Sequence, residues 1–195
     1  MGNHYLITGL GNPGRRYANT RHNAGFMLVD LLAERWKLTW SSDSRTKSEI
    51  ATRNVEGCKV TLCKPQTFMN ASGECVGPLL RWHKLEADAL LVAIDDADLE
   101  LGTLRMRAEG SSGGHHGLEN IERHIGTKKF ARQKIGIGRR QAGVREISGH
   151  VLGKFSEQEL PLIILVLERA ADQAECWIQH EAIEAMNRFN GSIDN

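Results

Sequence analysis

The stretch Ala89-Leu90-Leu91-Val92-Ala93-Ile94-Asp95 is a continuous apolar run that ends in a carboxylate. A strand that is apolar at every position, rather than at every second position, is typical of a central strand that is covered on both faces. Such strands belong to sheets that lie between layers of helices. The run therefore predicts an α/β protein in which Asp95 lies at one edge of the sheet.

The segments on either side of this run alternate between strand and helix patterns. Strand patterns occupy residues 4–8, 48–55, 58–63, 103–106 and 134–137, and helical spacing indicates helices over 26–36, 76–82 and 160–178, with a short one after 117. Ser156 and Glu159 form a capping-box pattern before the last helix. We therefore expect one domain over residues 1–195: a three-layer α/β sandwich with a central twisted mixed sheet and a long C-terminal helix.

The composition is that of a globular protein. Of 195 residues, 41% are hydrophobic and 25% are charged, which argues against a disordered chain. No apolar run is as long as a transmembrane helix, and the first ten residues lack the basic-then-apolar order of a signal peptide. The four cysteines have no CxxC spacing, so we expect reduced thiols. These features predict a cytoplasmic protein that does not bind membranes.

The formal net charge of +1 hides an uneven distribution. Between residues 102 and 154, eleven Lys or Arg oppose four acids, a local charge of +7, whereas residues 155–195 carry −6. A basic surface on a nearly neutral protein suits a polyanion that binds to one face. The alternative, charge scattered over a solvated surface, stays open from composition alone.

Three of the predicted strands end in polar or glycine-rich segments. The first runs into Gly9-Leu10-Gly11-Asn12, another ends near residues 64–70, and the central one ends at Asp95. In α/β folds, ligands bind outside the carboxyl ends of the strands. We therefore expect these three ends to line one crevice.

His22 is the strongest candidate for chemistry. It lies in the loop Tyr17-Ala18-Asn19-Thr20-Arg21-His22-Asn23-Ala24-Gly25, where core packing does not require a histidine. A neutral imidazole accepts a proton from water near pH 7. An acceptor on its other nitrogen fixes the tautomer and stabilises the imidazolium, and Asp95 is the natural supplier of that acceptor.

The loop Gly9-Leu10-Gly11-Asn12-Pro13-Gly14 matches the G-x-G-x-x-G pattern of a dinucleotide-binding turn. Such a turn should pass directly into an apolar helix, whereas eleven mostly small or polar residues intervene here, and Asp30 lies inside the helix. We therefore expect no dinucleotide cofactor. The glycines are expected to let backbone amides approach a substrate, with Asn12 presented between them.

Asp95-Asp96-Ala97-Asp98 places three carboxylates close together and could bind Mg²⁺. The spacing is not one of the metal-loop patterns, and the nearest histidines are the adjacent pair His115-His116. We therefore expect no required metal. A Ser or Cys nucleophile is also disfavoured, because no Ser occupies a strand-to-helix elbow and no Cys lies near His22.

Two further segments offer binding groups. In Lys64-Pro65-Gln66-Thr67-Phe68-Met69-Asn70, the phenylalanine either stacks on a nucleobase or packs in the core. The asparagine either orients water or a carbonyl or caps the next helix. In residues 110–118, glycines precede a helix N-terminus, which suits a phosphate or a ribose.

Together these segments resemble the bacterial-type peptidyl-tRNA hydrolases over essentially the whole chain. The matching blocks run in family order over residues 9–14, 17–25, 64–70, the strand ending at 95, 113–118, 135–138 and 149–153. The first two blocks are highly specific in combination. The resemblance implies a monomeric enzyme that needs no metal or cofactor and hydrolyses the ester between a peptide and its tRNA.

By this resemblance His22 would be the general base, and Asp95 would hold it in its basic form. Asn12 would recognise the peptide and separate blocked from free aminoacyl-tRNA, and Asn70 would position water or the carbonyl. The resemblance assigns contacts with the tRNA acceptor end and its backbone phosphates to Tyr17, Phe68, Asn70, His115, His116, Arg105, Arg107 and Lys134.

Two residues depart from the family pattern. The family has Asn after the histidine of its Gly-Gly-His-Asn-Gly-Leu block, where this chain has His116, so we expect that contact with the tRNA end in altered form. Lys134 replaces the usual arginine, which keeps the charge but loses a bidentate interaction with phosphate. The main alternative is a non-catalytic RNA-binding protein of the same fold. The intact catalytic candidates argue against it, whereas His116 leaves it open.

Overall fold

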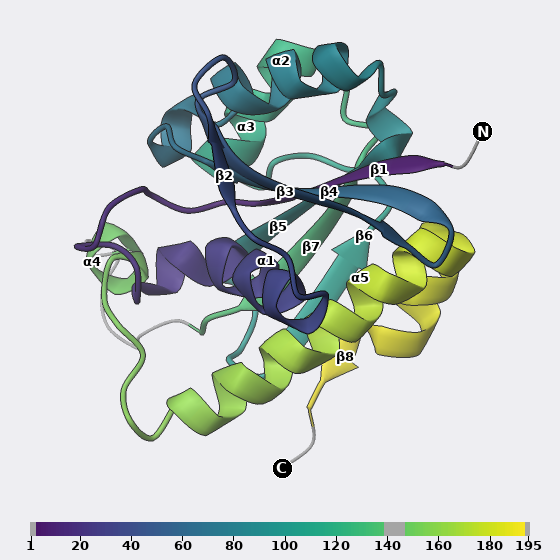
Figure 1. The fold of residues 1–195 in the computed structure, drawn as a ribbon. Coiled ribbons are helices and arrows are strands. Elements are labelled where there is room, and N and C mark those ends of the chain that lie inside the picture. The colour runs from purple at the N-terminus through teal and green to yellow at the C-terminus, as the bar shows by residue number, and fades with distance from the viewer. Residues whose placement is uncertain (1–2, 139–146, 194–195) are drawn as a thin grey trace.

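A mixed sheet of eight strands forms the centre of the computed structural model, which describes residues 3–138 and 147–193 (Figure 1). The strands are β1 (His4–Gly9), β2 (Ser41–Asp43), β3 (Ser48–Val55), β4 (Cys58–Pro65), β5 (Leu90–Asp96), β6 (Thr103–Arg107), β7 (Ala131–Gly136) and β8 (Gly191–Ser192). Their order is β2-β3-β4-β1-β5-β7-β6-β8. The inner strands β4, β1, β5 and β7 run parallel, and the outer ones pair antiparallel. Four carboxyl ends therefore share one edge.

The apolar run that predicted a central strand is buried on both faces. Leu91 and Ala93 of β5 belong to one buried cluster, and the alternating residues Leu90, Val92 and Ile94 belong to another. Since side chains alternate along a strand, the two clusters lie on opposite faces of the sheet. Asp95, which follows the apolar part of β5, therefore lies at the edge formed by the carboxyl ends of the parallel strands.

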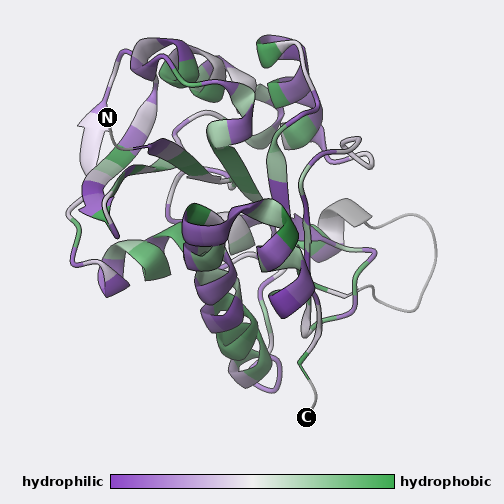
Figure 2. Ribbon diagram, turned by 90° about the vertical axis from the view of Figure 1, so that its right-hand side faces the viewer, coloured by the Kyte–Doolittle hydropathy of each residue, from purple (hydrophilic) through white to green (hydrophobic). Residues whose placement is uncertain are grey.

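Helices cover the sheet on both sides (Figure 1). α1 (Ala24–Arg35) and α5 (Leu160–Phe189) pack on one face, and α2 (Gly73–His83) and α3 (His116–Ile125) pack on the other. These helices carry hydrophobic and hydrophilic residues in stripes (Figure 2), as expected for elements with one buried side. The predicted three-layer sandwich with a long C-terminal helix is confirmed.

Shorter elements lie in the connections. They are α4 (Ile147–Val151) and the 3-10 turns η1 (Arg21–Asn23), η2 (Met69–Ala71) and η3 (Ala87–Ala89). None of these was predicted, nor were the short edge strands β2 and β8. Within the two described ranges, no helix combines the length and the hydrophobicity needed to span a membrane.

β7 begins at Ala131, ahead of its predicted start at residue 134. The sequence pattern missed this start because two of the first residues, Arg132 and Gln133, are polar and yet buried. Gln133 donates to the carbonyl oxygen of Ala170 at 2.8 Å and to Oε1 of Gln173 at 2.9 Å. Arg132 donates to the carbonyl oxygens of Gly110 and Lys128. A polar residue that finds partners inside the protein gives no strand signal in the sequence.

The predicted capping box before α5 is only partly present. Glu159 Oε2 accepts the backbone N–H of Ser156 at 2.6 Å, but the helix begins at Leu160, and Glu159 takes the N-cap position. The helix then runs to Phe189 with one interruption at Glu181, whose backbone is not helical.

The pKa of His4 makes stability depend on pH. His4 lies edge-on to His83 of α2, with ring centroids 4.9 Å apart. Burial, followed by the charges of Lys59 and His83, lowers the pKa of His4 from 6.5 to about 4. The unfolded chain therefore binds this proton more readily than the folded protein, so stability present above pH 6.5 is lost as the pH falls towards 4. We expect the melting temperature to fall over this range, and less steeply in His4→Gln. An unchanged pH dependence in that variant would contradict the assignment.

Candidate active site

The three strand ends that the sequence places at one crevice do lie together. The backbone N–H of Leu10, after β1, donates to the carbonyl oxygen of Ala93 in β5 at 2.9 Å. The backbone N–H of Met69, after β4, donates to Oδ1 of Asn12 at 2.9 Å. These bonds connect the ends of β4, β1 and β5 at the edge where catalytic candidates were expected.

Two histidines share one buried carboxylate at this edge. Nδ1 of His22 lies 2.8 Å from Oδ1 of Asp95, and Nε2 of His115 lies 3.4 Å from the same oxygen. The two ring centroids are 5.6 Å apart. The Asp95 side chain is 3% exposed and that of His22 is 18% exposed. The carboxylate is therefore shielded from water, whereas part of the His22 ring remains accessible.

The hydrogen bonds give the two histidines different proton positions. Nδ1 of His115 accepts the backbone N–H of Leu118 at 3.3 Å, so its Nε2 carries the proton that points to Asp95. His22 donates to Asp95 from Nδ1, and its Nε2 has no hydrogen-bond partner in the described parts of the chain. Neutral His22 therefore presents an unprotonated nitrogen, whereas both nitrogens of His115 are engaged.

Asp95 remains ionised at neutral pH. Burial by itself would raise the pKa of Asp95, but hydrogen bonds from His115 and His22 lower it well below its usual value. A fixed negative charge beside Nδ1 stabilises the imidazolium that forms when Nε2 takes a proton. The pair is therefore arranged as a base with a permanent counter-charge.

The segment that carries His22 is anchored to a distant part of the chain. Thr20 forms an isolated β-bridge with Lys154. The guanidinium of Arg21 donates to both carboxylate oxygens of Glu159, at 2.9 and 2.7 Å. Because Thr20 and Arg21 immediately precede His22, the anchoring fixes η1 in front of the end of β5.

Glycines allow α1 to pack closely against the strand ends. A Cβ atom on Gly25 would lie 2.3 Å from the carbonyl oxygen of Ala93, and one on Gly9 would lie 2.0 Å from the carbonyl oxygen of Gly25. A Cβ on Gly11 would lie 2.7 Å from the ring of Phe26. Gly9 and Gly11 therefore make room for α1, a different reason for glycine than the approach of backbone amides to a substrate that the sequence suggested.

Asn12 is held by bonds to both its backbone and its side chain. Its N–H donates to Oδ1 of Asn23 at 2.9 Å, and its carbonyl oxygen accepts from Nδ2 of Asn23 at 3.0 Å. Its side-chain oxygen is occupied by the N–H of Met69. The amide nitrogen Nδ2 has no partner among the described residues, so Asn12 offers fixed donors at this edge of the sheet.

Phe68, Asn70 and Tyr17 all have accessible side-chain surface. Phe68 is 60% exposed, so it is not a core residue. Asn70 is exposed within η2, and because the N-cap positions of η2 and α2 belong to Phe68 and Ser72, Asn70 caps neither helix. Tyr17 is half-buried. Their side chains are available to a ligand, and Phe68 and Asn70 flank Met69, whose N–H donates to Asn12.

The basic candidates lie on β6 and β7. Arg105 and Arg107 are exposed, and Arg105 is the register partner of Lys134 on the neighbouring strand. Register partners project from the same face of a sheet, so the three bases form one strip. Nζ of Lys134 lies 2.9 Å from Oδ2 of Asp96, so its charge is partly neutralised. The other bases counted in the basic stretch include Arg139, Arg140 and Arg145, which lie outside the described residues.

His116, the departure from the family pattern, is the first residue of α3 and is exposed. Its Nδ1 lies 3.7 Å from Glu119. The preceding residue, His115, points to Asp95 instead, an interaction that sequence reasoning missed. It also missed the Asn23 bonds to Asn12 and the Arg21–Glu159 ion pair. Of these three interactions, only the one made by Asn23 had a signal in the sequence, namely its position next to His22.

His22, Asp95 and His115 place three potential metal-ligand atoms within 4.8 Å of one another. A metal would need an unprotonated Nε2 on His115, which moves the proton to Nδ1. Nδ1 then could not accept the Leu118 N–H, which is the bond that caps α3. The hydrogen bonds present therefore fit a base and its counter-ion better than a metal centre.

The fold and this site define an α/β protein with a histidine–carboxylate centre suited to hydrolysis. A family model described as peptidyl-tRNA hydrolase matches residues 6–195. The peptidyl-tRNA hydrolase of Geobacillus kaustophilus is 45% identical over 185 residues, which cover 95% of this chain and 98% of that protein. That of Synechococcus sp. (strain JA-3-3Ab) is 46% identical over 185 residues, covering 95% and 82%. The chain belongs to the peptidyl-tRNA hydrolase family.

Solved structures agree with this assignment. A crystal structure of peptidyl-tRNA hydrolase from Acinetobacter baumannii matches with a TM-score of 0.91 and 38% identity, covering 98% of this chain and 97% of that one. A peptidyl-tRNA hydrolase in complex with N-propanol matches with a TM-score of 0.93 and 38% identity, covering 100% and 98%. A 5′-methylthioadenosine nucleosidase from Arabidopsis thaliana, at a TM-score of 0.54 and 8% identity, shares the fold alone.

Proposed function

We propose that this chain hydrolyses the ester bond between a peptide and tRNA, with His22 as general base and without a metal or other cofactor. One observation carries the proposal: His22 donates Nδ1–H to buried Asp95 and keeps Nε2 without a partner in the described ranges. Ester hydrolysis at neutral pH requires such a base for water. Membership of the family supplies the substrate class.

The reaction follows from the positions of the protons. Nε2 of His22 takes a proton from a water molecule whose oxygen attacks the ester carbonyl carbon, and Asp95 stabilises the imidazolium. The tetrahedral intermediate collapses by breaking the bond to the ribose oxygen, which receives the proton from His22. The products are the peptide acid and tRNA with a free hydroxyl group, and His22 is again neutral.

Asn12 gives this mechanism a means to recognise blocked substrates. With its side-chain oxygen engaged by Met69, it offers N–H donors, which suit a peptide carbonyl. A free α-amino group would present its own donors and a positive charge to these donors, which is unfavourable. We assign Asn70, beside it in η2, to the positioning of water or the ester carbonyl.

The accessible rings of Phe68 and Tyr17 suit the single-stranded 3′ end of tRNA. Phe68 offers a face on which a nucleobase can stack, and Tyr17 offers a second ring with a polar end. His116 would contact the same end from the start of α3, with imidazole nitrogens where the family has an amide. His115 we assign to positioning Asp95 rather than to tRNA, because both of its nitrogens are used inside the protein.

Arg105 and Arg107 should carry much of the affinity for tRNA phosphates. Replacing both by Ala should weaken tRNA binding and reduce the slope of log K against log salt by about 0.7–0.9 for each phosphate that the variant no longer binds. The turnover rate at saturating substrate should change little, because neither residue lies beside His22. Binding titrations at several salt concentrations measure the slope. Arg188→Ala removes an exposed arginine on α5 and is the matched control, and an equal effect there would refute a localised phosphate site.

We also propose that the protein acts as a monomer in the cytoplasm. All the groups assigned to the reaction come from one chain, and peptidyl-tRNA is produced where translation takes place. The non-catalytic RNA-binding alternative rests on His116 alone. It gives no reason for a histidine base that is paired with a buried carboxylate.

The test is release of free tRNA from N-acetyl-aminoacyl-tRNA in the presence of EDTA, beside unblocked aminoacyl-tRNA. We expect hydrolysis of the blocked substrate only, with no effect of the chelator. Activity that disappears with EDTA and returns with a divalent metal would replace the proposed mechanism by a metal-dependent one. Binding of tRNA with no hydrolysis would favour the non-catalytic alternative, and His116→Asn would then be the first variant to measure.

A further inference from the structure

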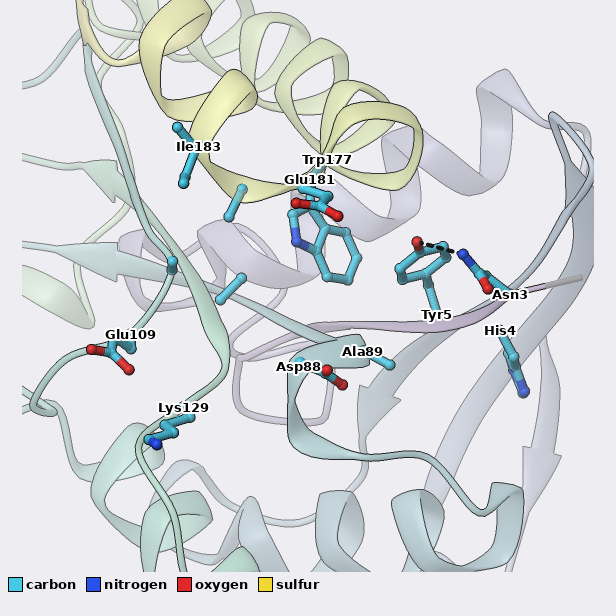
Figure 3. Close-up of a pocket in the computed structure, with 13 residues that line it drawn as sticks. Asn3, His4, Tyr5, Asp88, Ala89, Glu109, Lys129, Trp177, Glu181 and Ile183 are labelled. Carbon is cyan, nitrogen blue, oxygen red and sulfur yellow. Dashed lines mark hydrogen bonds between the residues drawn. The ribbon is translucent and has the colours of Figure 1, made fainter.

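A cavity of about 600 Å³ opens at the edge of the sheet opposite to the candidate active site (Figure 3). Its lining comes from the first residues of β1, the segments that lead into β5 and β7, the segment after β6, and the C-terminal part of α5. β1 starts at this cavity and ends at the edge of the sheet that carries His22 and Asp95, so one strand length separates the two. The volume is in the range of small-molecule sites, and none of the residues assigned above lines it.

One wall of the cavity is aromatic. Tyr5 and Trp177 lie edge to face, with centroids 5.0 Å apart. Trp177 is only 4% exposed, yet the nitrogen-bearing edge of its indole faces the cavity (Figure 3). No residue that the structure describes accepts a hydrogen bond from this N–H. Since a buried indole usually finds an acceptor, this donor is available to a ligand.

A break in α5 shapes the opening. Glu181 has φ 67° and ψ 174°, a left-handed backbone that is unfavourable for a residue with a side chain. The break places Glu181, Ala182 and Ile183 on the cavity lining, and Ile183 is 68% exposed. A strained backbone beside an exposed apolar side chain suggests a surface shaped for contact with another molecule.

The charges around the cavity are mainly negative. Asp88, Glu109 and Glu181 contribute carboxylates, and Lys129 is the one Lys or Arg among the described lining residues. Asp88 and Glu181 form no ion pair within residues 3–138 and 147–193. His4 also lines the cavity and is neutral at pH 7, because burial lowers its pKa to about 4. The site therefore repels phosphates, unlike the strip on β6 and β7.

We propose that this cavity binds small organic ammonium ions. The rings of Tyr5 and Trp177 pack against the apolar body of such a molecule. The carboxylates supply the counter-charge, and the indole N–H of Trp177 donates to an acceptor, such as a hydroxyl group, on the same molecule. The proposal does not depend on the hydrolase activity, since it uses a different end of the sheet.

The experiment titrates tyramine into the ¹⁵N-labelled full chain. The chain has four tryptophans, and Trp177→Phe assigns the indole signal that matters. We expect a saturable shift of that signal, with a dissociation constant on the order of 1 mM. Tyrosol, which replaces the ammonium by a hydroxyl, should bind about threefold to fivefold more weakly, as expected for partly exposed ion pairs. Phenethylamine, which lacks the phenolic oxygen, should shift the indole signal less.

Two variants separate charge from shape. Asp88→Asn combined with Glu181→Gln should weaken tyramine binding and leave tyrosol binding unchanged, whereas Glu157→Gln, which does not line the cavity, should alter neither. Equal affinities for tyramine and tyrosol would overturn the proposal, since they would indicate an apolar cleft without charge selection. The absence of any saturable shift at Trp177 would also overturn it.

Discussion

The His22→Ala variant should hydrolyse N-acetyl-aminoacyl-tRNA at least about 10²-fold more slowly than the parent, because general-base catalysis commonly contributes that much. The affinity for tRNA should be largely kept, since the strip of Arg105, Arg107 and Lys134 on β6 and β7 is unchanged in this variant. Single-turnover rates and tRNA binding, measured side by side, give the two quantities separately. Residual activity should depend less on pH, because no histidine is then required in its neutral form.

His180→Ala, an exposed histidine on α5, is the matched control and should hydrolyse at the parental rate. If His22→Ala also hydrolysed at that rate, the assigned base would be wrong. His115 could not simply replace His22, because its Nδ1 is engaged by Leu118 and its Nε2 by Asp95. A parental rate would therefore call for a different mechanism, not for an exchange of histidines.

The Asp95→Asn variant should lose about 10²–10⁴-fold in turnover, although the side chain is nearly isosteric. An amide that turns its NH₂ group towards His22 forces Nδ1 to accept, which moves the proton to Nε2 and removes the base. An amide that turns its oxygen towards His22 keeps the tautomer but loses the counter-charge. Either orientation weakens the base that takes a proton from water.

A spectroscopic measurement distinguishes the proposed effect of Asp95 on the His22 tautomer from a general loss of structure. The ¹⁵N shifts of the His22 ring should report Nδ1–H in the parent and a larger share of Nε2–H in Asp95→Asn. Asp30→Asn, an exposed carboxylate that binds Lys64, should alter neither the tautomer nor the rate. A variant with an intact fold, an unchanged tautomer and full activity would refute the role given to Asp95.

The parts of the fold that follow from local periodicity could be predicted. The apolar run of β5 identifies a strand covered on both sides, and strand order then brings the ends of β1, β4 and β5 together. The pairing of His22 with Asp95 follows from that placement and from the chemistry of imidazole. These predictions needed only the alternation of side chains and the rule for ligand position in α/β sheets.

Interactions that depend on buried polar partners could not be predicted. Arg132 and Gln133 interrupt the apolar pattern of β7, yet both are buried, because their partners come from other elements. The approach of His115 to Asp95 depends on where α3 starts, and periodicity does not fix a helix start to within a residue. A side chain whose partner is far along the chain leaves no periodic signal.

The anchoring of η1 has a consequence for the synthesis of the protein itself. A growing chain is joined to tRNA through an ester bond, which is the kind of bond that we propose this enzyme cleaves. Arg21 and Glu159 are separated by 138 positions, and the β-bridge from Thr20 reaches Lys154. The loop that carries His22 is therefore synthesised early, but its contacts with Lys154 and Glu159 can form only when most of the chain has been translated. We expect the nascent protein to be inactive towards its own ester and those of neighbouring ribosomes until its synthesis is nearly complete.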